Sequence, residues 1–136
     1  MTRDEVIAYI QQVHFGYLAT VGADNAPRVR PVGIYNVYGD DLYWFTLSNT
    51  RKVAEIEANP QVEVVWCKLE EQSQVRIRGK MVVEEDEAIQ QQFREDNPIV
   101  ANLLPKEAQY LFRLYKLQPE VVEVAKGMVP YTEVDW

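Results

Sequence analysis

The chain has 136 residues, an ordinary soluble composition and a formal net charge of −7 at pH 7. This length predicts one domain, residues 1–136, that can bury a hydrophobic core. The acidic balance argues against a nucleic-acid-binding protein, which needs a basic face, and no apolar run approaches the roughly 20 residues of a membrane-spanning helix. We therefore expect neither nucleic acid nor a membrane as a partner.

Two residue types with special chemistry occur only once. Cys67 is the single cysteine, so an intrachain disulfide is impossible and a cytoplasmic location fits. The charged N-terminus lacks the apolar region of a signal peptide. His14 is the single histidine, which excludes most histidine-based metal sites, so we expect no metal.

The first half of the chain alternates short apolar segments with turn residues. Thr2 and Glu5 have the spacing of a capping box and predict an amphipathic helix over 3–13. Strands are expected over 16–21, 28–38 and 42–47, and their short connections predict an antiparallel meander. Pro31 and Gly33 interrupt the second of these strands and indicate an edge, a bulge or a close backbone approach.

The second half contains four further predicted strands and two helices. A short helix over 52–59 precedes strands over 62–66 and 74–83, and a second helix covers 86–96. Residues 97–107 form a loop or short helix, and two final strands, 111–117 and 121–125, flank Pro119. Many short strands and few helices predict a mainly β fold, a β-barrel of antiparallel strands with peripheral helices.

The segment 45–52 combines features of an anion site. A β-prone run ends in hydroxyl and amide side chains, and Arg51 and Lys52 then open a helix. Free N–H groups at a helix start favour negative charge, whereas two cations there are unfavourable unless an anion compensates them. A phosphate is the obvious candidate. The alternative is two solvated cations, with Asn49 or Thr50 as a simple N-cap.

Polar side chains on two predicted strands could also meet a ligand. Arg28 and Arg30 are two residues apart and share a strand face, and the arginine fork suits phosphate or a polar ring edge. Gln74 offers both a donor and an acceptor, which suits a heterocycle. Each of these residues could equally be a solvent-exposed polar group.

Taken together in order and spacing, these motifs resemble the FMN-binding split-barrel proteins related to pyridoxamine 5′-phosphate oxidase. The resemblance is carried by residues 17–21, 27–32, 42–46, 50–52 and 59–60 and by the strand from Gln74 to Gly79. It implies a split β-barrel that binds FMN, with Arg51 and Lys52 on the phosphate and Arg30 and Gln74 at the ring edge. The implied cofactor-binding residues are Arg30, Pro31, Val32, Phe45, Thr46, Ser48, Thr50, Arg51, Lys52 and Gln74.

The departures from the oxidase concern its substrate. The resemblance places Tyr35 where the oxidase has a phosphate-binding lysine, and Gln92, Asp96 and Val100 where it has a Tyr, Arg and Ser set. The last eight residues contain neither Arg nor His. We therefore expect a small bacterial relative rather than the authentic oxidase, with catalytic residues that the sequence does not identify.

The resemblance implies an FMN-dependent oxidoreductase that acts on a small organic acceptor, as a flavin reductase or nitroreductase-like enzyme does. It also implies a homodimer with flavin sites at the interface, and NAD(P)H as a candidate donor. The alternatives are a non-catalytic, stress-related flavin-binding protein of regulatory type and a relative that uses deazaflavin or haem.

Overall fold

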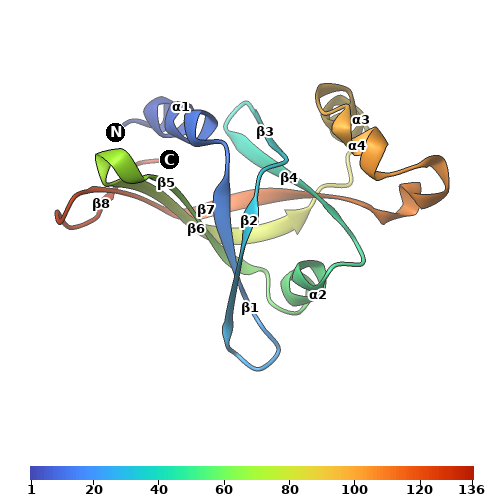
Figure 1. Ribbon diagram of the computed structural model, residues 1–136, viewed down its shortest axis with the longest axis horizontal. Coiled ribbons are helices and arrows are strands. Elements are labelled where there is room, and N and C mark those ends of the chain that lie inside the picture. Colours follow the sequence, from blue (N-terminus) through green and yellow to red (C-terminus); the bar gives the residue numbers. More distant parts are fainter.

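The computed structural model describes all 136 residues and shows a mostly β fold. One antiparallel sheet curls into half a barrel, and helices lie at its ends and edge (Figure 1). This confirms the predicted fold class. The strands are β1 (Gly16–Val21), β2 (Pro27–Val32), β3 (Tyr35–Tyr38), β4 (Asp41–Leu47), β5 (Gln61–Lys68), β6 (Ser73–Val83), β7 (Phe112–Lys126) and β8 (Thr132–Glu133).

The predicted meander of the first strands is wrong. The segment 28–38 is two strands, and the sheet order β2-β1-β5-β6-β7-β4-β3 places them at opposite ends of the sheet. The chain leaves β2 at Gly33, where an added Cβ would lie 2.3 Å from the Phe15 ring. A side chain at this position would therefore displace the Phe15 ring, which is 56% exposed. The break carries the chain from one end of the sheet to the other.

The two strands expected at the C-terminus are one continuous strand. β7 runs for 15 residues through Pro119 and pairs with both β6 and β4. The register shifts between Arg78 and Gly79, opposite Pro119. A proline lacks the N–H that a ladder needs, and the bulge accommodates that loss without ending the strand.

The helices close the open parts of the sheet. They are α1 (Arg3–Val13), α2 (Arg51–Ala58), α3 (Glu87–Asp96) and α4 (Ile99–Leu103), with 3₁₀ turns η1 (Leu69–Glu71) and η2 (Lys106–Leu111). The capping box at Thr2 and Glu5 is present. None of these helices has the length and apolar character that crossing a membrane requires.

Two apolar clusters hold the fold together. The larger one contains Trp66, Ile77 and Leu117 of the curled sheet together with Val6 and Ile10 of α1. The smaller one lies under α3 and α4 and includes Phe93 and Phe45. The smaller cluster matters for function because Phe45 also borders the cavity described next.

Candidate functional site

A cavity of about 240 Å³ lies where the β2–β3 connection, β4 and the start of α2 meet. Residues 31–34 form one wall, residues 44–47 form another, and Thr50 and Lys52 close the end. The walls are held together by backbone pairing: Tyr35 is opposite Trp44, and the Phe45 N–H donates to the Ile34 carbonyl at 3.1 Å. The fold thus combines an apolar slot with a polar end.

The polar end is the N-terminus of α2, which carries cations and no acidic residue in its first turn. The N-cap Thr50 makes no side-chain bond to the helix; its hydroxyl instead donates to the Leu47 carbonyl at 2.9 Å. Neither Arg51 nor Lys52 takes part in an ion pair of the chain. Both cations and the helix dipole therefore remain available to an anion.

The partial burial of Lys52 makes this end of the cavity favourable for a negatively charged ligand. Burial first, and then the positive charge of Arg30, lower the pKa of the Lys52 amine below its ordinary value. A bound phosphate would reverse both effects because it supplies a counter-charge and hydrogen-bond acceptors. The solvated-cation alternative therefore fits Lys52 poorly.

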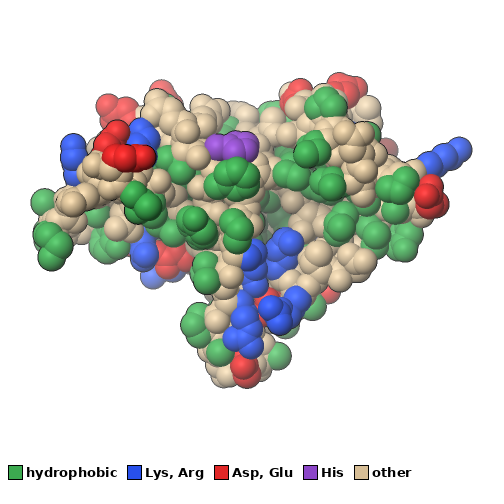
Figure 2. All heavy atoms as spheres, in the orientation of Figure 1, with side chains coloured by type: hydrophobic (Ala, Val, Ile, Leu, Met, Phe, Trp, Pro, Cys, Tyr) green, Lys and Arg blue, Asp and Glu red, His purple; other side chains and the backbone are tan.

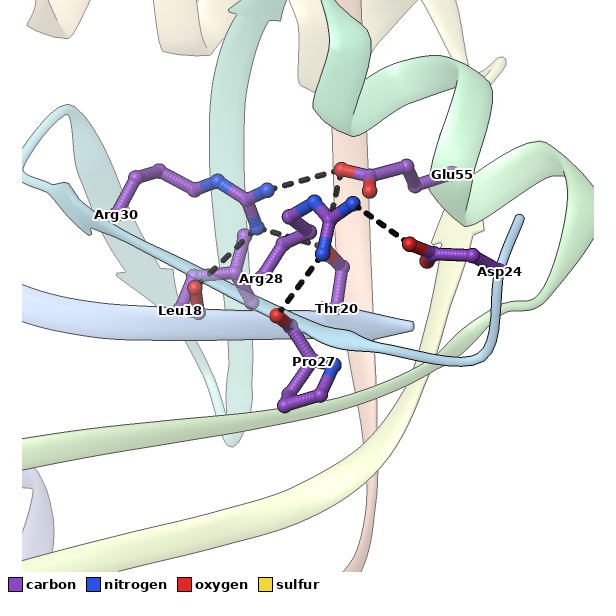
Figure 3. Close-up of polar contacts among 7 residues, drawn as sticks. All are labelled: Leu18, Thr20, Asp24, Pro27, Arg28, Arg30 and Glu55. Atoms are coloured by element: carbon purple, nitrogen blue, oxygen red, sulfur yellow. Dashed lines mark hydrogen bonds and ion pairs between the residues drawn. The ribbon is translucent and has the colours of Figure 1, made fainter. Parts of the chain in front are cut away.

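Arg30 is the centre of a partly buried polar network beside the cavity (Figure 3). Its guanidinium donates to the Glu55 carboxylate at 2.9 Å, to the Thr20 hydroxyl at 2.8 Å and to the Leu18 carbonyl at 3.3 Å. Burial lowers the pKa of Arg30, Glu55 raises it, and the nearby charges of Arg51 and Arg28 lower it again. The network fixes the Arg30 side chain between β1 and α2.

Basic side chains gather where the β1–β2 hairpin faces α2 (Figure 2). Arg28 and Arg30 share one face of β2, as their spacing predicted, and lie close to the two cations of α2. Two carboxylates, Asp24 and Glu55, pair with Arg28 and Arg30. Four cations and two carboxylates leave a local surplus of two positive charges in a chain whose net charge is −7.

The structure brings most of the predicted cofactor residues together. The predicted residues that line the 240 Å³ cavity are Pro31, Val32, Phe45, Thr46, Thr50 and Lys52. Arg30 lies beside them in the partly buried network, and Arg51 lines a neighbouring cavity on the other side of the α2 start. Ser48 lines neither cavity; it is half-buried, and its N–H donates to the Leu111 carbonyl at 2.8 Å.

Gln74 lies apart from this group. It borders a different cavity, of about 390 Å³, between the ends of β6 and β7 and the C-terminal tail. Its side-chain oxygen accepts from Arg76 at 3.0 Å and from Tyr131 at 3.2 Å. Within one chain, Gln74 therefore does not border the cavity that holds Lys52.

Several lining residues are not among the cofactor-binding residues that the resemblance implies individually. Gly33 and Ile34 extend the wall begun by Pro31 and Val32, and Trp44 and Leu47 flank the predicted pair Phe45 and Thr46. Their position next to predicted site residues was the available signal. No sequence pattern predicted a role for Glu55 at the site, because its partner Arg30 is distant in sequence and only the fold brings the two together.

Comparison with known proteins points to one family. The sequence profile of the family described as pyridoxamine 5′-phosphate oxidase matches residues 2–125. A pyridoxine/pyridoxamine 5′-phosphate oxidase from Psychrobacter cryohalolentis is 36% identical over 74 residues, which cover 53% of this chain and 33% of that protein. The chain thus spans a third of that relative's length.

Solved structures share the fold across nearly the whole chain. A putative pyridoxamine 5′-phosphate oxidase from Listeria innocua has a TM-score of 0.75 at 26% identity and covers 90% of this chain and 96% of its own. An FMN-binding protein from Nostoc punctiforme, related to the oxidase, has a TM-score of 0.68 at 16% identity, with coverages of 96% and 88%.

A haem-binding protein from Mycobacterium smegmatis also shares the fold, with a TM-score of 0.77 at 15% identity, covering 98% of this chain and 57% of its own. At such identities the likeness concerns the fold and not the ligand. The family profile, by contrast, extends over almost the entire chain. The predicted relationship is therefore confirmed: this chain belongs to the pyridoxamine 5′-phosphate oxidase family.

Proposed function

We propose that this protein binds FMN and works as an FMN-dependent oxidoreductase on a small organic acceptor, with NAD(P)H as the electron donor. The observation that carries the proposal is the cavity with an apolar slot at one end and, at the other, the unpaired Lys52 at the N-terminus of α2. FMN has the same division, because a planar ring system is joined through a polyol chain to a phosphate.

Each part of the cavity has a role in this proposal. Lys52 and Arg51 hold the phosphate together with the Thr50 hydroxyl and the free N–H groups of α2. The walls at 31–34 and 44–47 hold the ring and exclude water from one of its faces. When bound, FMN supplies the redox chemistry, and the protein positions and tunes it.

The lining offers little acid–base chemistry of its own. Lys52 is the only ionisable side chain that borders the 240 Å³ cavity. A hydride or electron transfer that the cofactor itself performs is compatible with such a lining. The same lining would also suit a flavin-binding protein that does not catalyse a reaction, which is the second candidate. Oxidation of NADH or NADPH in the presence of quinone and nitro acceptors separates the two.

We further propose that the site is completed by a second copy of the chain. The cavity of about 240 Å³ lies below the roughly 300–1,000 Å³ of typical small-molecule sites. Exposed apolar residues adjoin it: Tyr17 and Val29 are 49% and 68% exposed, and Pro31 belongs both to this face and to the cavity wall. A partner on this face would add walls, and Gln74 could meet the flavin only from that partner.

Flavin titrations test the proposal. The purified protein should retain FMN after excess ligand is removed. Replacing Arg51 and Lys52 together by alanine should lower the affinity for FMN about 100-fold, because two charge-assisted contacts are lost. The affinity for riboflavin, which lacks the phosphate, should change little. The measurement is flavin fluorescence during titration, with deazaflavin and haem as parallel ligands.

A matched control is the double substitution Arg78→Ala with Lys80→Ala, which removes the same charge from exposed positions of β6. It should leave FMN binding unchanged. Equal losses of affinity for FMN and riboflavin in the Arg51/Lys52 variant would show that these two residues do not bind the phosphate. A protein that takes up haem but no flavin would replace the flavin proposal altogether.

A further inference from the structure

The cavity of about 390 Å³ that Gln74 borders lies at the end of the sheet away from α2 (Figure 1). Side chains of α1, the end of β5, the start of β6, the end of β7 and the C-terminal tail line it, and it shares no residue with the cavity proposed for FMN. Part of its wall is apolar and comes from Val124, Ala125, Val129 and Pro130. Its volume falls within the roughly 300–1,000 Å³ of small-molecule sites, so it can hold a ligand of its own.

One row of the sheet brings two lysines to this cavity. Ser73 of β6 pairs directly with Lys68 of β5 on one side and with Lys126 of β7 on the other. Directly paired residues place their side chains on the same face of a sheet, so the two lysines flank the serine. The core residues Trp66 and Val75 lie two positions further along their strands on this same face. The row therefore lies where the core of the half-barrel opens into the cavity.

Neither lysine of this row has a carboxylate partner. The Lys68 ammonium donates to the neutral side chain of Gln12 at 2.6 Å and lies 4.6 Å from the centre of the Tyr9 ring. Glu71 is the one acidic residue of the lining, and it pairs with neither lysine. Two lysine ammonium groups and one carboxylate leave the lining side chains with a surplus of one positive charge.

A pair of buried hydroxyl groups in the same lining has one hydrogen to spare. Tyr9 and Ser73 are 5% and 9% exposed, and their side-chain oxygens are 2.8 Å apart. The Tyr9 oxygen also accepts from the Lys68 N–H at 3.0 Å. Two hydroxyl groups carry two hydrogens, and one of these forms the bond between them. The other hydrogen has no acceptor in the chain, so this part of the cavity is suited to a ligand that accepts.

We propose that this cavity binds a small organic acid, a monocarboxylate with a compact apolar body. The carboxylate lies at the row of Lys68, Ser73 and Lys126, where it accepts the spare hydroxyl hydrogen and meets two ammonium groups. The apolar body packs against Val124 and Val129. A carboxylate suits this row because it accepts hydrogen bonds without donating any and compensates the surplus charge. The site does not depend on the flavin site proposed above.

Titration of the flavin-free protein with benzoate tests this assignment, and benzyl alcohol is the uncharged probe with the same ring. Chemical shifts of the nitrogen-labelled protein report both affinity and location. Benzoate should bind at least about tenfold more tightly than the alcohol, because the alcohol forms no charge-assisted contacts. The largest shifts should fall at Ser73 and Lys126. Equal affinities for the two probes, or no binding of benzoate, would overturn the proposal.

The flavin cavity also carries cations, so its variant serves as a control. The double substitution Arg51→Ala with Lys52→Ala should leave benzoate binding unchanged, and so should saturation with FMN. Loss of benzoate binding in either case would show that the probe occupies the flavin cavity and that the assignment is wrong. A protein that binds FMN but not benzoate loses only the site proposed here, and one that binds benzoate but no flavin loses only the flavin site.

The hydroxyl pair gives a test that depends on the count of hydrogens. Tyr9→Phe and Ser73→Ala each leave one spare O–H, so each should change the benzoate affinity by less than about threefold. The double variant has no hydroxyl hydrogen left, and its affinity should fall about tenfold. Tyr110→Phe, which removes an exposed hydroxyl group from η2, should have no effect. A double variant that binds as tightly as the single variants would contradict the role of the spare hydrogen.

Lys126→Gln tests the charge at an exposed position, where the substitution does not disturb the core. It should lower the affinity for benzoate about tenfold and leave that for benzyl alcohol unchanged, because only the carboxylate meets the ammonium group. Lys106→Gln removes the same charge from an exposed position of η2 and should change neither affinity. Equal benzoate affinities in the two lysine variants would overturn the proposal, even where the hydroxyl double variant fails to fold.

Discussion

Glu55 shows how one buried side chain connects the sheet, the helix and the candidate site. Its carboxylate is 8% exposed and accepts from Arg30 and Thr20. Glu57, two residues further along the same helix, pairs with Arg113 but is 58% exposed. The two glutamates therefore provide a matched comparison of a buried and an exposed ion pair.

Glu55→Ala should lower the free energy of unfolding by about 2–4 kcal/mol, because it leaves Arg30 without its counter-charge in a largely buried position. Glu57→Ala should cost no more than about 1 kcal/mol, since solvent already screens its pair. Urea denaturation of the flavin-free protein measures both values. Equal losses in the two variants would show that the network contributes nothing beyond an ordinary surface pair.

At the scale of elements, the pairing of β6 with β7 explains how a strand continues through a proline. A Cβ added to Gly79 would lie 2.0 Å from the Gln118 carbonyl oxygen. The neighbour is backbone and cannot rotate away as a flexible side chain would. Gly79 is thus the residue that permits the bulge opposite Pro119 and keeps β7 continuous.

Gly79→Ala should destabilise the protein by about 3 kcal/mol or more, through a backbone clash in the middle of the sheet. Gly39→Ala is the control: Gly39 has a φ of +61° in a turn with nothing within 4 Å of an added Cβ, so only conformational strain of about 1 kcal/mol is expected. Thermal unfolding followed by circular dichroism compares them. Similar melting temperatures for the two variants would contradict the steric explanation.

At the scale of the whole molecule, the candidate cavity opens beside an exposed apolar face. Phe15, Tyr17 and Val29 are each about half exposed or more. Val29 and Tyr17 lie on neighbouring strands, diagonal to one another across the β1–β2 ladder. Apolar residues clustered in this way mark an interaction surface more often than isolated ones do.

Val29→Glu should convert the proposed dimer to a monomer without unfolding the chain, because the side chain is already 68% exposed in the single copy. Light scattering should then give the 15.8 kDa mass of one chain, compared with twice that for the unsubstituted protein. Leu103→Glu, at an exposed position of α4, should stay dimeric. An unsubstituted protein that is monomeric at all concentrations would contradict the dimer proposal.

The sequence by itself determined much of the local structure and the position of two cations at a helix start. Capping at Thr2, alternation in β6 and the cations at 51 and 52 are short-range patterns, and each was predicted correctly because neighbouring residues dictate it. The order of the motifs also identified the family. These features depend on periods of two to four residues or on fixed spacing along the chain.

Only the tertiary structure decided which strands became neighbours. Local patterns could not show that the chain crosses the sheet at Gly33, that Pro119 lies within a strand or that Glu55 meets Arg30. Each depends on packing between residues far apart in sequence, where a close approach or a buried charge selects one partner among many. The same packing places Gln74 away from Lys52.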